Sequence, residues 1–207
     1  MKIGILALQG DFIEHSKMLK SLGAEAVEVR RLEQVSCVDG LIIPGGESTT
    51  MLNLLHSYDL FQPIRQRALN GMPVMGTCAG MILLAKKVFN PDMETLALMD
   101  ISVRRNAFGR QVDSFEAMLD IQQVSNEPFP AIFIRAPFIE SAESNVEVLS
   151  SLPDGTIVAA RQGNMLALAF HPELCNDTRL HRYFLGMISE YLSSNGKCVT
   201  EKAAITD

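Results

Sequence analysis

The fold is indicated most directly by residues 73–87, which read PVMGTCAGMILLAKK. An apolar run ending at Met75 leads into a small-residue turn around Cys78, and a helix-forming run follows from Met81 to Lys87. This order of strand, tight turn and helix is a nucleophile elbow, in which flanking glycines let the backbone bend sharply. The N–H groups at the head of the helix favour thiolate over thiol and can hold an oxyanion. We therefore predict a nucleophilic Cys78, with a buried structural cysteine as the alternative.

A candidate base follows the apolar, strand-like residues 165–170, where the sequence reads His171-Pro172-Glu173. In extended chain Glu173 can reach one ring nitrogen of His171, which leaves the other nitrogen free for Cys78. This is the arrangement of nucleophile, base and orienting acid. The alternative is a capped strand end with a solvated glutamate. The remaining histidines lie in helical patterns and are predicted to be solvated or to serve packing: His15, His56 and His181.

Residues 41–50, LIIPGGESTT, place paired glycines between a strand end and a cluster of helix N-cap residues. The backbone N–H groups of Gly45 and Gly46 can approach a ligand closely and donate to an oxyanion or a carboxylate. An ordinary turn is the alternative for this segment alone. The three segments together, in this chain order, favour a catalytic site.

Composition fits one compact enzyme domain. With 207 residues the chain lies within the usual size of a single domain, and we predict a domain over 1–193 with a mobile tail over 194–207. A formal charge of −6 argues against a general nucleic-acid surface. The apolar run over residues 1–8 is too short for a leader peptide or a membrane span, and we predict that it forms a strand. Four cysteines without paired spacing predict a reducing cytoplasm, and no metal-binding pattern occurs, so we expect no metal.

Strands alternate with helices through the first ninety residues, which predicts a parallel sheet covered on both faces. The fold class is therefore α/β, a three-layer structure with a mostly parallel sheet. From about residue 98 the alternation becomes less regular, and antiparallel additions are expected. The predicted strands span 3–8, 26–29, 40–44, 73–75, 146–149, 156–160 and 166–170, and the predicted helices span 12–22, 49–56, 61–69, 81–87 and 178–192.

With these residues in place, the sequence resembles the class I, triad-type glutamine amidotransferases, whose fold is flavodoxin-like. The general markers are residues 44–46, 76–80 and 171–173. The resemblance is closest to the branch that supplies ammonia for pyridoxal 5′-phosphate (vitamin B6) synthesis. The markers of that branch are residues 7–12 with 14–15, 46–50, 105–111 and 134–137.

The resemblance implies that Cys78 attacks the side-chain amide of L-glutamine and that His171, oriented by Glu173, protonates the leaving ammonia and then activates water. Arg105 would bind the substrate carboxylate, with a surface ion pair as the alternative reading of this residue. The implied site has catalytic Cys78, His171 and Glu173, an oxyanion hole of Gly46 and Ala79, and substrate contacts from Gly46, Glu47, Ser48, Arg105, Ile134 and Arg135.

The resemblance also implies a partner, a (β/α)₈-barrel synthase that consumes the ammonia to make pyridoxal 5′-phosphate. No nucleotide or phosphate-binding loop occurs in this chain, so no cofactor, nucleic acid or membrane is expected among its ligands. Three other functions stay open: the glutaminase of a different amidotransferase, a stand-alone triad cysteine amidase or peptidase, and a non-catalytic regulatory subunit.

Overall fold

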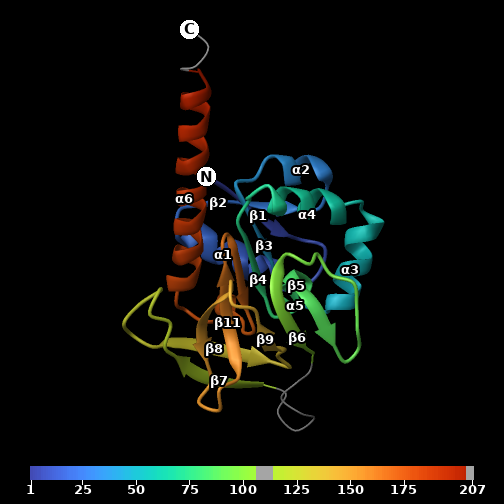
Figure 1. Cartoon of the computed structure of the whole chain (residues 1–207), viewed down its shortest axis with the longest axis vertical. Coiled ribbons are helices and arrows are strands. Elements are labelled where there is room, and N and C mark those ends of the chain that lie inside the picture. The colour runs from blue at the N-terminus through green and yellow to red at the C-terminus, as the bar shows by residue number, and fades with distance from the viewer. Residues whose placement is uncertain (106–113, 204–207) are drawn as a thin grey trace.

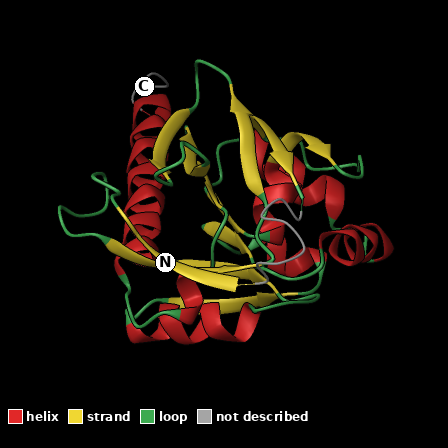
Figure 2. Ribbon diagram, turned by 90° about the horizontal axis from the view of Figure 1, so that it is seen from below, coloured by secondary structure: helices red, strands yellow, loops and turns green. Residues whose placement is uncertain are grey.

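A mixed sheet forms the centre of the structure (Figure 1). Its strand order is β2-β1-β3-β4-β12-β11-β9-β6-β5, and β10 pairs with β11. The structure is a computed structural model that describes residues 1–105 and 114–203, with side chains described as far as residue 194. Helices lie on both sides of the sheet (Figure 2). The predicted three-layer α/β class with a mostly parallel sheet is thereby confirmed.

The regular half of the sheet consists of parallel strands that run side by side in the order β2-β1-β3-β4-β12. Every residue of β3, β4 and β12 is buried. Strands covered on both faces read as continuous apolar runs, which explains their sequences. Their bounds are β1 Lys2–Leu6, β2 Glu25–Val29, β3 Gly40–Ile43, β4 Val74–Thr77 and β12 Met165–Leu168.

The helices form two groups around this sheet. The first and last helices meet through a pair of buried histidines, whereas α3 packs against both α4 and α5, and α2 packs against α4. A short 3-10 turn, η1, follows β12. The bounds are α1 Phe12–Ser21, α2 Leu32–Ser36, α3 Ser48–Ser57, α4 Phe61–Leu69, α5 Ala79–Leu84, η1 Pro172–Leu174 and α6 Arg179–Ala203.

The second half of the chain adds strands that are mainly antiparallel, as predicted. Strands β5 and β6 are a parallel pair at the sheet edge, and β7 with β8 forms a separate antiparallel hairpin. The bounds are β5 Ala85–Phe89, β6 Met99–Arg104, β7 Ser114–Leu119, β8 Phe129–Ile134, β9 Phe138–Ala142, β10 Glu147–Ser151 and β11 Ile157–Gln162.

Two helix ends differ from the sequence predictions. The helix predicted over 81–87 ends at Leu84, because the chain from Ala85 pairs with β6 and tertiary pairing outweighs local propensity. The last helix does not end near Leu192 but continues to Ala203, and it extends beyond the body of the molecule (Figure 1). The hydroxyls of Ser193 and Ser194 donate to carbonyls four residues earlier, so these serines are accommodated within the helix.

The mobility of residues 194–207 stays a prediction. Among the residues that the structure describes, none of the helices has the length and apolar character needed to cross a membrane.

Candidate active site

Cys78 occupies the turn between β4 and α5 in a strained backbone conformation, with φ 46° and ψ −101°. A positive φ is uncommon for a side-chain-bearing residue and typical of functional turns. The backbone N–H of Cys78 donates to the carbonyl of Leu168 at 2.8 Å, which fixes the turn to β12. The thiol is buried, 4.0 Å from the carbonyl oxygen of Ile134 at the end of β8.

The glycines on both sides of Cys78 are required by close packing. A Cβ atom at Gly76 would lie 2.5 Å from the backbone of Gly80, and a Cβ atom at Gly80 would overlap the carbonyl of Ile43 in β3. The turn therefore fits only when both residues lack side chains. The predicted elbow is present, with Cys78 directly before the first residue of α5, Ala79.

His171 and Glu173 form the predicted pair: Nδ1 of the imidazole lies 2.7 Å from Oε1 of the carboxylate. We predicted an extended chain at this point, but residues 172–174 form the turn η1. This turn still brings the carboxylate under the ring. The N–H of His171 donates to the carbonyl of Ile132 in β8 at 2.8 Å, which holds the imidazole beside the elbow.

Burial and hydrogen bonding set the charge of this pair. Burial lowers the pKa of His171, but hydrogen bonds to Asp11, Cys78 and Glu173 outweigh burial and raise it. The pKa of Glu173 is raised by burial, against the opposing effect of its hydrogen bond to His171. The raised pKa of His171 favours the imidazolium form, which places a proton donor beside the nucleophile.

A cavity of about 460 Å³ opens onto Cys78 and His171. This volume suits a small-molecule substrate. All six predicted substrate contacts line the cavity, whereas Ala79 and Glu173 do not lie on its wall. The lining residues are Gln9, Asp11, Gly46, Glu47, Ser48, Cys78, Ile82, Arg105, Ile134, Arg135, Pro137, His171 and Leu174.

Gly46, the second residue of the glycine pair, lines this cavity. The carbonyl of Gly45 accepts the N–H of Asp11 at 3.1 Å, and Oε1 of Gln9 accepts the N–H of Glu47 at 2.9 Å. Gly46 has φ 149°, and a Cβ atom there would lie 2.5 Å from the Gln9 side chain. The loop after β1 therefore supports the loop after β3, a contact that the sequence analysis did not foresee.

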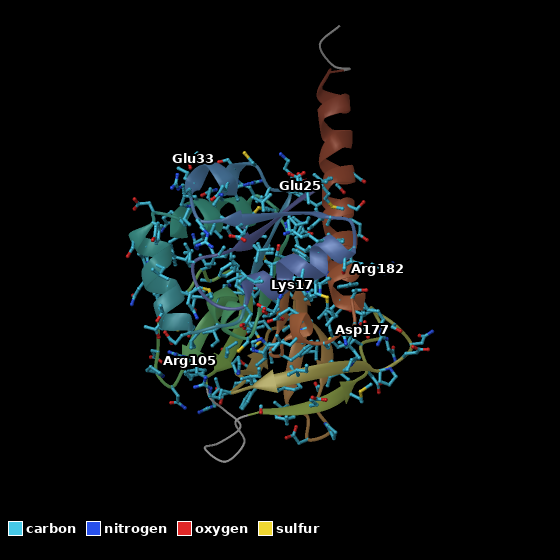
Figure 3. All side chains as sticks on the ribbon, turned by 180° about the vertical axis from the view of Figure 1, so that it is seen from behind. Lys17, Glu25, Glu33, Arg105, Asp177 and Arg182 are labelled. Atoms are coloured by element: carbon cyan, nitrogen blue, oxygen red, sulfur yellow. The ribbon has the colours of Figure 1, made fainter. Side chains whose placement is uncertain are left out.

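Arg105 enters the cavity from the end of β6, on the side of the molecule opposite Asp177 (Figure 3). Its Nη2 atom lies 3.1 Å from Oε1 of Glu47. Glu47 also accepts the N–H groups of Thr49 and Thr50 and so caps α3. The remaining residues of the predicted marker over 105–111, from Asn106 onward, lie outside the described residues.

Sequence reasoning missed three acidic or imidazole side chains around the pair. Asp11 Oδ2 lies 3.4 Å from His171 Nδ1. The buried His15 lies 3.3 Å from Glu173 and contacts the buried His181. The pattern of α1 gave one signal that could have located His15, because it falls on the same helical face as the buried Leu19. Ligand atoms of Asp11, His171 and Glu173 lie within 4.8 Å of one another, and we attribute this to their hydrogen bonding.

Comparisons with known proteins identify the family of this chain. A family model described as the SNO glutamine amidotransferase family matches residues 5–190. A protein of Dehalococcoides mccartyi named pyridoxal 5′-phosphate synthase subunit PdxT is 60% identical over 193 residues, covering 92% of this chain and 99% of the relative. A protein of the same name from Carboxydothermus hydrogenoformans is 55% identical over 192 residues, covering 93% and 100%.

Solved structures show the same relationship. A crystal structure titled glutamine amidotransferase is 46% identical, covers 90% of this chain and 98% of its own, and superposes with a TM-score of 0.85. A GMP synthase subunit from Thermoplasma acidophilum, 16% identical, covers 95% and 98% with a TM-score of 0.69 and shares the fold. The predicted family is thus confirmed: this chain belongs to the SNO glutamine amidotransferase family.

Proposed function

We propose that this chain is the glutaminase subunit of a pyridoxal 5′-phosphate synthase and releases ammonia from L-glutamine. The observation that carries this proposal is the convergence of Cys78, from the β4–α5 turn, with the hydrogen-bonded pair of His171 and Glu173 after β12. The names of relatives at 53–60% identity support the assignment to this synthase.

The chemistry proceeds through a thioester. The Cys78 thiolate attacks the amide carbon of the glutamine side chain, and the N–H groups of Gly46 and Ala79 stabilise the oxyanion. His171, as imidazolium, protonates the departing ammonia when the tetrahedral intermediate collapses. The neutral imidazole then takes a proton from water, which hydrolyses the γ-glutamyl thioester to glutamate and regenerates the thiol. Glu173 keeps the proton of His171 on Nδ1, so that Nε2 serves the reaction.

Recognition of the free amino acid falls to the rim of the cavity. Arg105 uses one guanidinium nitrogen for Glu47 and has further N–H donors for the α-carboxylate of glutamine. Ser48 Oγ is buried on the cavity wall and has no hydrogen-bond partner within the described ranges, which leaves this hydroxyl for a ligand. The Gly46–Ser48 segment and the Ile134–Arg135 backbone line the rest.

Ammonia in neutral water becomes ammonium and is lost as a nucleophile, so release is productive only beside an acceptor enzyme. We propose that this acceptor is a (β/α)₈-barrel synthase that docks against this chain in the cytoplasm. The proposal needs no cofactor or metal on the chain itself.

The test is to measure glutamate release from L-glutamine, with and without the synthase, against a panel of peptide and simple amide substrates. We expect L-glutamine to be the only substrate of the panel that is hydrolysed. Cys78→Ser should abolish this activity, whereas Cys37→Ser, which changes an exposed cysteine, should retain it. Cleavage of peptides in preference to glutamine would replace the proposal with a peptidase. No glutamate release even in the complex would favour a regulatory subunit.

A further inference from the structure

Two buried histidines, neither of which lines the cavity, form a chain of contacts that begins at Glu173. His15 comes from α1 and His181 from α6, and both are 0% exposed. Nδ1 of His15 lies 2.9 Å from Nε2 of His181. Nε2 of His15 lies 3.3 Å from both Thr77 Oγ1 and Glu173 Oε2. The contact with Thr77 is a hydrogen bond. The Glu173 oxygen lies at the same distance from this nitrogen and interacts with it as a nearby charge.

The partners decide which nitrogens carry protons. Glu173 Oε2 has no hydrogen-bond partner within the described ranges, and Nε2 of His15 lies 3.3 Å from it. A bare nitrogen there would set a lone pair against a carboxylate, which costs free energy at a buried site. The proton of His15 therefore sits on Nε2, and Nδ1 accepts from the Nε2–H of His181.

The remaining nitrogen supports the same assignment. Nδ1 of His181 is buried with no partner among the described residues. In the assignment above this nitrogen is only an unused acceptor. With the opposite tautomers, or with a charged His15, the nitrogen would carry a stranded N–H, which is rarer and more costly in protein interiors. Burial, His181 and His171 also lower the pKa of His15, and burial lowers that of His181 to about 4, so both rings are neutral.

We propose that His15, held by His181, is a positioning residue that presents an N–H to the second oxygen of Glu173 and keeps this carboxylate ionised and directed at His171. The inference rests on the proposed glutaminase function. The proton of His171 then binds Oε1 and the proton of His15 faces Oε2, so the carboxylate is held from both sides. Thr77 connects this array to the elbow, because it directly precedes Cys78.

The pH dependence follows from the groups that face Glu173. These are His171 and Asp11 beside the cavity, Cys175 after η1, and His15 with His181 behind. Burial already favours the protonated carboxyl, and the N–H of His15 opposes it. Loss of this N–H raises the pKa of Glu173, so the acidic limb of the kcat/KM profile moves to higher pH.

The first experiment is independent of activity. Two-dimensional ¹H–¹⁵N spectra of the chain labelled with ¹⁵N-histidine report the tautomer of each ring. We expect His15 and His181 to be neutral and protonated on Nε2, with assignment by His15→Gln and His181→Gln. A proton on Nδ1 of either ring, or a charged His15 at neutral pH, overturns the proposal whether or not the chain hydrolyses glutamine.

The second experiment compares His15→Leu with His15→Gln in the chain–synthase complex, with kcat/KM for L-glutamine measured across pH. Leucine lacks a donor, and we expect the midpoint of the acidic limb to rise by roughly half a pH unit or more, because the carboxylate loses the polar N–H group that faces it at 3.3 Å. Glutamine restores a donor near the position of Nε2 and should return the limb towards the parent.

The control is His56→Leu, which removes an exposed histidine paired with Glu94 and should leave the limb unchanged. Identical limbs in the parent and both His15 variants, or equal shifts in both variants, would overturn the positioning role. An inactive parent complex would instead refute the glutaminase function, and the spectra would still decide the tautomers if a variant failed to fold.

Discussion

The interior side of the site and its open rim are built differently. His171 and Glu173 are no more than 5% exposed, and each of their positions is fixed by several backbone or side-chain contacts. On the rim, the side chain of Glu47 is 51% exposed and Asp11 38%. The difference teaches that the reacting groups are set by the fold, whereas the rim combines largely buried groups, Arg105 and Ser48, with side chains that water can reach. Changes inside should lower kcat, and changes on the rim should raise KM.

The largest effect is expected from Cys78→Ala. The smaller side chain fits the elbow, but no thioester can form, so glutaminase activity should be abolished while the melting temperature stays near that of the parent. An electrophilic glutamine analogue should label Cys78 and spare Cys37, Cys175 and Cys198, although Cys37 is exposed and Cys78 is buried. Mass spectrometry of the labelled peptide checks this. Preferential labelling of Cys37 would show that accessibility, rather than the site, controls reactivity.

Within the interior pair, substitution of His171 should lower kcat more than substitution of Glu173. His171→Asn is expected to lose about 10⁴-fold or more in kcat, close to the loss in Cys78→Ala. Glu173→Gln keeps a side chain of the same size but loses the charge that supports the imidazolium, and it should lose roughly 10- to 100-fold less. Single-turnover kinetics of the two variants measure this. Equal, small losses in both variants would mean that another base serves Cys78.

The synthase should act at the boundary between interior and rim. The carbonyl of Gly45 is bound to Asp11, so the N–H of Gly46 points the other way across the same peptide. This peptide lies between glycines and rotates at low steric cost. One oxyanion donor is worth about 10²- to 10³-fold in rate. We expect the isolated chain to be slow and the synthase to raise kcat by about 10-fold or more.

Titration of the chain with synthase during a glutamate-release assay checks this expectation. If the isolated chain is already fully active, the oxyanion hole is formed without a partner and the boundary between the two regions carries no regulation.

Arg105 tests the rim itself. Arg105→Lys loses the planar fork of donors, and we expect KM for glutamine to rise about 10-fold or more with kcat changed less. Arg104→Lys is the matched control, because Arg104 pairs with Glu140 on β9 and does not line the cavity. If Glu47→Gln raises KM as much as Arg105→Lys does, the arginine serves mainly to hold Glu47. A fall in kcat at unchanged KM would remove the distinction between interior and rim.

The smallest effect concerns stability. Burial disfavours the charged form of Glu47, yet hydrogen bonds from Thr50 and Thr49 outweigh this and lower its pKa to about 2. A depressed folded-state pKa stabilises the fold above the ordinary pKa, and this contribution is lost as pH falls from about 4.5 towards 2. Glu47→Ala should therefore cost about 1 kcal/mol at neutral pH and progressively less in acid. Urea unfolding at several pH values measures the difference.

The same division separates what the sequence predicted from what it did not. The parallel core was predicted, because buried strands such as β3 and β4 read as apolar runs between turn signals. The hydrogen-bonded pair was also predicted, because His171 and Glu173 are only two residues apart. The sheet edge was missed at Ala85, where pairing with β6 overrides helical propensity.

The contacts of Glu173 with the buried histidines could not be predicted from the sequence, for a different reason. His15, Thr77 and His181 come from α1, β4 and α6, and only the folded topology brings them to one carboxylate. A buried histidine on an amphipathic helix looks like any packing residue in the sequence. The support of the Gly46 loop by Gln9 is a contact of the same kind between distant loops.

The strained turn at Cys78 places the nucleophile for catalysis but lowers the stability of the fold. A residue with φ 46° and ψ −101° costs about 1–3 kcal/mol when it carries a side chain, and glycine relieves most of that cost. A variant library selected only for heat resistance would consequently enrich Cys78→Gly, a more robust protein without a nucleophile. Engineering of this scaffold must therefore select for turnover and thermal tolerance together.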